Sequence, residues 1–200
     1  MKLLSKERAL DIGRGAYDHV VARTPLGAGN DATNPHNWHG TTYIGGVGIP
    51  TPSFFGDGTG VAGICVAQLR KDYEAKVEAD GVTEEIDRLF LLAELTGQAG
   101  CGNCAEVTAA VIVWLMKHRV EGPIEKMSYA DGDHTFCVLN RDWNTPVNEP
   151  AHWNEAAVYI DVWRRDLSLG RDMALRNRRN FGRFGAPAYG FTVNQRWERG

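Results

Sequence analysis

The strongest chemical signal in the sequence is the segment from Gly97 to Glu106, which reads GQAGCGNCAE. We expect Cys104 to occupy the first turn of a helix that follows a glycine-rich turn. Backbone N–H groups and the positive end of the helix dipole favour a thiolate there, the reactive form of cysteine. The same amides can donate to an oxyanion formed when the sulfur attacks a carbonyl carbon, and Gln98 offers a side-chain NH2 as a second donor. The segment therefore predicts a nucleophilic cysteine.

A thiolate that attacks an amide needs a base that holds the ion pair and later protonates the leaving group. His134 suits that role because the alternating pattern of HTFCVLN places it at the start of a strand. The base in turn needs a partner that fixes its tautomer. Asp161 fits, because a carboxylate inside the otherwise apolar strand AAVYIDVW is costly without a partner. Neighbouring strands would bring His134 and Asp161 side by side.

The pattern Gln98-x-x-Cys101-Gly-x-Cys104 resembles the motif of papain-type cysteine proteases, in which a glutamine stands six residues before the nucleophile. Asp161-Val-Trp163 resembles the N-x-W element of that family, with aspartate in place of asparagine. The aspartate and the short spacings of 30 and 27 residues are more similar to the compact Cys-His-Asp branch of the papain-like superfamily. That branch includes transglutaminase-like enzymes, bacterial effector proteases and toxin glutamine deamidases.

The resemblance implies a papain-like α+β fold, in which a central helix carries the nucleophile and packs on a short antiparallel sheet. It implies Cys104 as nucleophile, His134 as base, Asp161 as the residue that orients the base and Gln98 as oxyanion donor. The implied reaction is attack on an amide through a thioester, with no cofactor or metal ion. The substrate would be a protein, attacked at a peptide bond or at a Gln side chain, and a peptidoglycan peptide is less favoured. Position 105 is Ala, where papain-type enzymes carry an aromatic residue.

The other cysteines leave alternatives open. Secreted members of the papain family pair the cysteine equivalent to Cys101 with a distant cysteine, and Cys65 and Cys137 are both candidates here. A competing interpretation takes Cys101-Gly-Asn-Cys104 as a C-x-x-C redox or binding motif, although the strand-helix alternation expected around such a motif is missing. Zinc binding by Cys101, Cys104, Cys137 and His134 is weaker still, because no second paired-ligand motif accompanies the C-x-x-C.

Hydrophobic periodicity predicts helices first and strands after them. We expect helices over residues 2–23, 64–77, 83–97 and 104–119. Thr83 is the expected N-cap of the third helix and Gly97 its end. The fourth helix is apolar on nearly all sides in its middle, so it should be buried. Alternation of period two predicts strands within 134–140, 156–163 and 188–197. This order predicts an α+β fold with an antiparallel sheet.

A chain of 200 residues suits a single domain, and we expect one papain-like domain over residues 1–200. Residues 1–62 would hold the first helix and a segment, 24–60, that is rich in Gly and Pro and predicted to be irregular. Residues 164–200 form a basic, Arg-rich part with a net charge of +6, against −9 for residues 1–163. This part would hold an acidic partner, pack against the acidic remainder or be solvated.

Composition excludes several classes of protein. No run approaches the roughly 18 apolar residues that a membrane-spanning helix needs, so no membrane partner is expected. The net charge of −3 argues against a dedicated nucleic-acid binder. The start, MKLLSKERALDIGRG, has too short an apolar run and too many charges for a Sec-type signal. We therefore expect a cytoplasmic protein or one exported by a specialised secretion system, as a bacterial effector or toxin would be.

Overall fold

The computed structural model describes residues 1–31, 34, 36, 41–44, 47–50, 60–130, 133–173 and 190–198, with only the backbone described over 41–44 and 47–50. The chain forms two compact units. The first unit combines Met1–His19 with Val111–Gly200, and the second comprises Val20–Ala110. Helices α1 (Lys6–Arg23) and α4 (Cys104–Lys117) each contribute residues to both units.

The first unit contains a five-stranded antiparallel sheet with the strand order β6-β5-β4-β3-β7. Its strands are β3 (Ile124–Tyr129), β4 (Thr135–Leu139), β5 (Val158–Asp161), β6 (Asp166–Leu169) and β7 (Phe191–Trp197). A short 3-10 helix, η2 (Pro150–His152), lies in the connection from β4 to β5. Because β4 and β5 run antiparallel, with Cys137 opposite Ile160, the start of β4 lies beside the end of β5.

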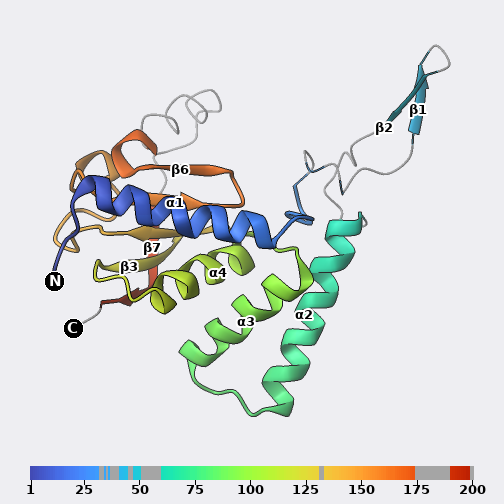
Figure 1. Cartoon of the computed structure of the whole chain (residues 1–200), viewed down its shortest axis with the longest axis horizontal. Helices are drawn as coiled ribbons and strands as arrows, with labels where there is room; N and C mark the ends of the chain where they lie inside the picture. Colours follow the sequence, from blue (N-terminus) through green and yellow to red (C-terminus); the bar gives the residue numbers. More distant parts are fainter. Residues whose placement is uncertain are drawn as a thin grey trace. The chain divides into compact units, whose positions relative to one another are not determined.

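Both faces of this sheet are covered, which explains the nearly continuous apolar character of β4 and β5. One face carries a cluster of buried side chains: Met127, Tyr129, Phe136, Val138, Trp153, Ala157, Tyr159, Met173 and Phe191. On the other face α1 runs along β5 and β6 (Figure 1). Gly13 allows this close approach, because a Cβ there would lie 3.1 Å from Val158 Cγ1.

A buried ion pair ties the sheet together. Glu125 on β3 and Arg141, beyond the end of β4, are both fully buried. The Nε and Nη2 atoms of Arg141 donate to the two carboxylate oxygens of Glu125, each at 2.7 Å. Arg196 on β7 donates to the same carboxylate at 2.9 Å. These charge-assisted hydrogen bonds satisfy a carboxylate that the sheet interior would otherwise exclude.

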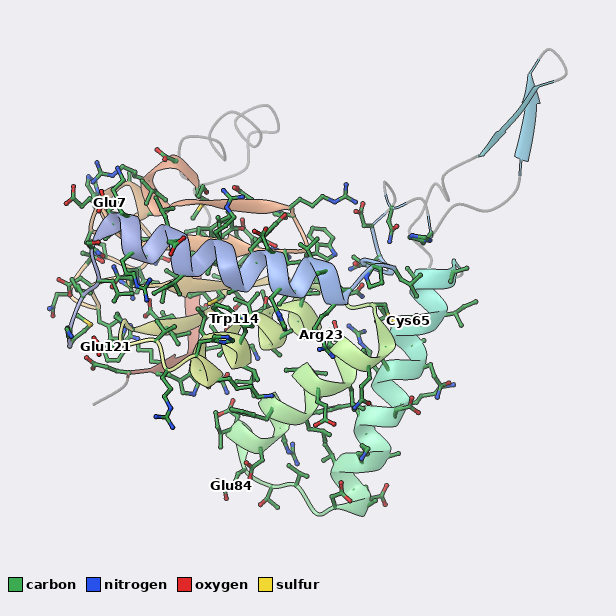
Figure 2. All side chains as sticks on the ribbon, in the orientation of Figure 1. Glu7, Arg23, Cys65, Glu84, Trp114 and Glu121 are labelled. Carbon is green, nitrogen blue, oxygen red and sulfur yellow. A yellow bond between two sulfur atoms is a disulfide. The ribbon has the colours of Figure 1, made fainter. Side chains whose placement is uncertain are left out.

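The second unit contains the helices α2 (Val61–Ala79) and α3 (Glu85–Ala99), the start of α4, and a hairpin of β1 (Thr41–Ile44) and β2 (Val47–Pro50). α2 and α3 pack through Val66, Leu69 and Leu95. Cys101, which follows α3, belongs to the same core and forms a disulfide with Cys65 on α2. Cys65 is labelled in Figure 2. The disulfide fixes the segment that leads into α4.

The predicted α+β fold class is confirmed, with helices and an antiparallel sheet. The helices predicted over 64–77 and 104–119 correspond to α2 and α4, and the three predicted strands correspond to β4, β5 and β7. In the part of the chain that the structure describes, no helix is long and apolar enough to cross a membrane.

The predicted boundaries of the third helix are wrong at both ends. Glu84, whose side chain makes no capping hydrogen bond, occupies the N-cap position assigned to Thr83. The helix also continues through Gly97 to Ala99, and Gly100 ends it with a left-handed φ of 74°. A single glycine inside a helix costs only about 1 kcal/mol, which the packing of α3 on α2 offsets.

The segment 24–60 is not irregular throughout, because it contains the β1–β2 hairpin. Its two strands are separated in sequence by Gly45-Gly46, a hairpin signal that the high Gly and Pro content of the segment obscured. β3 and β6 were also not predicted. In β3 the charged pair Glu125-Lys126 interrupts the apolar pattern, and the buried Glu125 is paired with arginines that are distant in sequence.

Candidate functional site

His134 and Asp161 are in contact in the first unit. His134 directly precedes β4, and its carbonyl oxygen accepts a hydrogen bond from the N–H of Tyr129 at 3.1 Å, which closes the β3–β4 hairpin. Asp161 is the last residue of β5, beside β4. His134 Nε2 lies 2.6 Å from Asp161 Oδ2. The sheet therefore brings these two predicted residues together.

The carboxylate of Asp161 is almost fully enclosed, with 1% of the side chain exposed. Its Oδ2 also accepts a hydrogen bond from the hydroxyl of Tyr159 at 2.5 Å. Its Oδ1 accepts one from the backbone N–H of Arg164 at 3.0 Å, within the β5–β6 turn. A buried carboxylate is stable only when such donors replace water. Three donors therefore hold Asp161 in one orientation.

This arrangement selects one tautomer of His134. An ionised carboxylate only accepts hydrogen bonds, so the proton in the contact with Asp161 belongs to Nε2. In the neutral ring Nδ1 then carries the lone pair, which is the form that a general base needs. The His134 side chain is 12% exposed, and its ring centroid lies 5.0 Å from that of Trp163 and 5.5 Å from that of Tyr129. These rings restrict water around the hydrogen bond and strengthen it.

Cys104 is the first residue of α4, is half-buried and lies outside the disulfide. The carbonyl of Asn103 accepts the first helical hydrogen bond, from the N–H of Val107 at 3.1 Å. Glu106 Oε2 accepts the N–H of Asn103 at 3.0 Å, as in a capping box. Arg70 Nε donates to Glu106 Oε1 at 2.7 Å. This hydrogen bond raises the pKa of Arg70 and ties the guanidinium on α2 to the first turn of α4.

The loop before Cys104 is fixed from two sides. The disulfide between Cys101 and Cys65 ties it to α2. The N–H of Gly102 donates to the carbonyl of Gly27 at 3.2 Å, and Asn103 Oδ1 accepts two backbone N–H groups from the residues that follow Gly27, at 2.9 and 3.3 Å. The start of α4 is therefore a rigid place for a reactive side chain.

The disulfide between Cys65 and Cys101 affects the redox and zinc interpretations of the cysteines. Cys101 is bonded to Cys65, so it is not paired with Cys104 and is not available as a zinc ligand. In the described part of the chain, no group of three or more His, Cys, Asp or Glu side chains is arranged to hold a metal ion. Cys137 is fully buried in β4, and burial raises the pKa of its thiol well above the ordinary value.

Gln98 lies in the last turn of α3, and its side chain is exposed. Its amide nitrogen donates to Glu94 Oε1 at 2.9 Å, one helical turn earlier. The side chain expected to stabilise an oxyanion is therefore engaged within its own helix. A role as oxyanion donor would require Gln98 to leave Glu94 when substrate binds.

Cys104 belongs to the second unit, and the His134–Asp161 pair belongs to the first. No protein-family model and no curated protein sequence matches this chain. Its function is therefore inferred from its own residues and their geometry.

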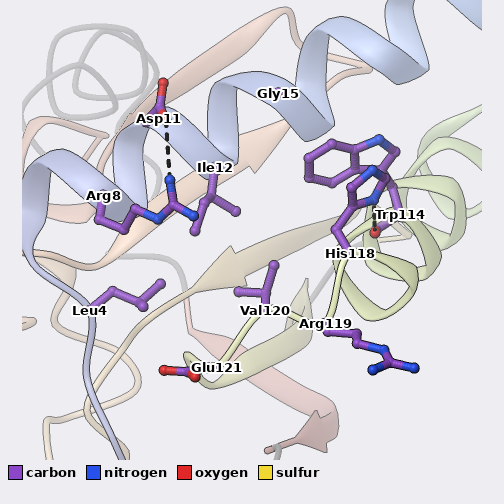
Figure 3. Close-up of a pocket in the computed structure, with 10 residues that line it drawn as sticks. All are labelled: Leu4, Arg8, Asp11, Ile12, Gly15, Trp114, His118, Arg119, Val120 and Glu121. Carbon is purple, nitrogen blue, oxygen red and sulfur yellow. Dashed lines mark hydrogen bonds and ion pairs between the residues drawn. The ribbon is translucent and has the colours of Figure 1, made fainter.

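A pocket of about 620 Å³ lies in the first unit, between α1 and the residues at the end of α4 (Figure 3). One wall is formed by Trp114 and His118, whose rings stack with centroids 3.8 Å apart. The other carries the exposed ion pair of Arg8 and Asp11, at 3.7 Å. None of the candidate catalytic residues lines this pocket.

Two residues of the site were not identified from the sequence. Tyr159 stands two positions before Asp161 on the same strand face, a spacing that was visible but had no distinctive meaning. Arg70 stands in the middle of α2, and no sequence signal relates it to Cys104. Both roles depend on the three-dimensional arrangement.

Proposed function

We propose that this protein is a thiol hydrolase of papain-like type, which attacks an amide of a protein substrate through a thioester on Cys104. His134 is the general base and acid, and Asp161 orients it. The observation that carries the proposal is the buried hydrogen bond between His134 and Asp161. The sheet encloses the Asp161 carboxylate, which accepts three hydrogen bonds, one of them from His134. A histidine held by a buried carboxylate in one tautomer is typical of a catalytic base.

In the proposed mechanism, the proton of the Cys104 thiol moves to Nδ1 of His134. The resulting imidazolium keeps its Nε2–H on Asp161, which stabilises the positive charge. The thiolate then attacks the carbonyl carbon of the substrate amide, and N–H groups at the start of α4 stabilise the oxyanion. When the tetrahedral intermediate breaks down, the proton on Nδ1 passes to the leaving nitrogen. A thioester between Cys104 and the acyl group remains.

The second half of the reaction restores the enzyme. His134 Nδ1 takes a proton from water, and the oxygen attacks the thioester, which releases a carboxylic acid and the Cys104 thiolate. If the amide was a peptide bond, the result is cleavage; if it was a Gln side chain, ammonia leaves and Glu is formed. An amine in place of water would give transglutamination. The mechanism requires Cys104 Sγ to approach Nδ1 to about 3–4 Å.

Two features of the second unit support the role of Cys104. Its position at the first residue of α4 provides N–H donors and a favourable dipole. The neighbouring guanidinium of Arg70 offsets the negative charge of Glu106 at the same helix end. The Cys65–Cys101 disulfide argues against the redox alternative and favours an exported protein that meets an oxidising compartment.

The proposal can be tested before a substrate is identified. Wild-type protein and Cys104→Ala are incubated with a cell-extract proteome, and mass spectrometry reads new N-termini, Gln-to-Glu conversions and Gln–amine conjugates in the same samples. We expect one of these product classes to appear with wild type and to be absent with Cys104→Ala and His134→Ala. Identical product profiles for folded wild type and Cys104→Ala would contradict the proposal.

The chain offers a matched control for the histidine. His152 Nδ1 also lies 2.6 Å from a carboxylate oxygen, that of Glu149, but its side chain is 69% exposed. His152→Ala removes a histidine–carboxylate pair of the same length without touching the candidate site. We expect it to retain wild-type activity, so a loss in His134→Ala can be attributed to the buried pair.

A further inference from the structure

Tyr159 belongs to the buried cluster on one face of the sheet, together with Phe136, Val138 and Ala157. The residue is 1% exposed, and its hydroxyl donates to Asp161 Oδ2 at 2.5 Å. Phenylalanine would fill the same space without a buried hydroxyl, which costs free energy unless it is hydrogen-bonded. The hydroxyl is therefore explained by its contact with Asp161.

Tyr159 is rigidly held, so its hydroxyl has a defined position. The residue lies within β5, opposite Val138 of β4. Its ring packs against Phe136 with centroids 4.8 Å apart. A ring fixed by its strand and by neighbouring side chains has little freedom to follow a carboxylate that rotates. The carboxylate instead orients toward the ring's hydroxyl.

The hydroxyl is a permanent donor. Burial raises the pKa of Tyr159 well above 10, and the negative charge of Asp161 adds to the effect. The phenol therefore stays protonated over the whole range in which thiol chemistry operates. It serves neither as a base nor as a nucleophile at neutral pH, so its action on the site goes through Asp161.

Separate donors hold the two carboxylate oxygens of Asp161 and so fix the plane of the carboxylate. The N–H of Arg164 holds Oδ1 at 3.0 Å, and Tyr159 holds Oδ2. With both oxygens held by these donors, the second lone pair of Oδ2 faces His134 Nε2, which lies 2.6 Å away. Without the Tyr159 hydroxyl, the Arg164 N–H would be the only one of these fixed donors left, and the carboxylate would have more freedom to rotate relative to the His134 ring.

We propose that Tyr159 is a positioning residue that fixes the Asp161 carboxylate and thereby the Nε2–H tautomer of His134. The inference deepens the proposed function, on which its catalytic meaning rests, but the effect on His134 is independent of Cys104 chemistry. It adds a fourth member to the proposed Cys104, His134 and Asp161 set. That member acts through Asp161 and touches no reacting atom.

The test compares Tyr159→Phe with wild type by two readouts. The first is the pair of imidazole 15N shifts of His134, which report how the proton divides between Nε2 and Nδ1. The loss of one hydrogen bond should lower the ratio of the two tautomers by about three- to tenfold. The second readout is the rate at which iodoacetamide modifies Cys104 across the neutral pH range, which should fall by a similar factor.

Two variants separate positioning from a general structural effect. Tyr129→Phe removes a hydroxyl from another ring that stacks on His134. That hydroxyl accepts a hydrogen bond from Arg164 Nη1 at 3.2 Å. It should change the tautomer ratio by less than about twofold. In an Asp161→Asn background the effect of Tyr159→Phe on both readouts should disappear, because its route of action is already removed.

The outcomes distinguish this inference from the proposed function. Altered His134 shifts with an unchanged Cys104 rate support the positioning role and contradict the use of His134 by Cys104. Unchanged shifts in folded Tyr159→Phe overturn the positioning role, whatever the Cys104 rate. If Tyr159→Phe does not fold, 3-fluorotyrosine at position 159 keeps the ring and makes the hydroxyl a stronger donor. Unchanged His134 shifts in that protein would equally overturn the inference.

Discussion

Removing the disulfide gives a prediction whose size follows from the structure. Cys65 and Cys101 are 36 residues apart in sequence, and a cross-link of that span restricts the unfolded chain by about 4 kcal/mol of free energy in the chain-entropy estimate. Both residues belong to the α2–α3 core, where alanine fits without adding polar groups. We therefore expect the double variant Cys65→Ala, Cys101→Ala to be less stable by about 2–4 kcal/mol.

Urea unfolding followed by tryptophan fluorescence measures this difference for oxidised wild type, wild type with reducing agent, and the double variant. Reduced wild type and the double variant should have similar midpoints, both below that of the oxidised protein. A double variant within about 0.5 kcal/mol of oxidised wild type would refute the reasoning. The same variant separates the two interpretations of the C-x-x-C, because thiol hydrolysis needs only Cys104 and should survive, whereas redox chemistry needs Cys101 as well.

Three further predictions concern other parts of the molecule. Arg141→Met leaves the Glu125 charge buried with only a peripheral partner and should lower the free energy of unfolding by about 3–5 kcal/mol, measured by urea titration; a loss below about 1 kcal/mol would contradict the importance of the pair. Burial raises the pKa of Cys137, so the folded protein keeps a proton that the unfolded chain loses above the ordinary thiol value of 9.0. The stability from this group is present below that pH and is lost as the pH rises above it. Cys137→Val should therefore reduce the alkaline decline in the free energy of unfolding by about 1.4 kcal/mol per pH unit. An unchanged slope would contradict this. A Cβ at Gly102 would lie 2.9 Å from Glu106 Cβ, so Gly102→Ala should cost about 1–3 kcal/mol and slow alkylation of Cys104, read by mass spectrometry against a wild-type control; an unchanged rate would show that the loop adapts.

The elements that were predicted from the sequence are those whose stabilising contacts are local. The apolar run after Asn103 predicts α4, and alternation predicts β4 and β5. β3 was missed because the partners of its Glu125, Arg141 and Arg196, lie 16 and 71 residues away in sequence. Pairing of that kind is a tertiary effect that a local pattern does not contain.

The candidate site could be predicted to a similar extent. Asp161 was identifiable because a carboxylate within an apolar strand needs a partner, and His134 was the histidine at a neighbouring strand start. The pairing of Cys101 was open, since a sequence alone does not fix which cysteines meet. The engagement of Gln98 with Glu94 and the role of Tyr159 follow from side-chain orientations that only the folded chain defines.

The most direct test of the central claim is the pH dependence of Cys104 alkylation, read residue by residue by mass spectrometry. We expect Cys104 to react faster than Cys137 near neutral pH, because Cys104 is half-buried at the start of α4 whereas Cys137 is fully buried in β4. At that pH the proposal predicts that His134→Ala slows the reaction by about tenfold or more, because the proposed base for the thiol is removed, whereas His152→Ala should not slow it. Equal rates in wild type and His134→Ala, or faster modification of Cys137, would contradict the account.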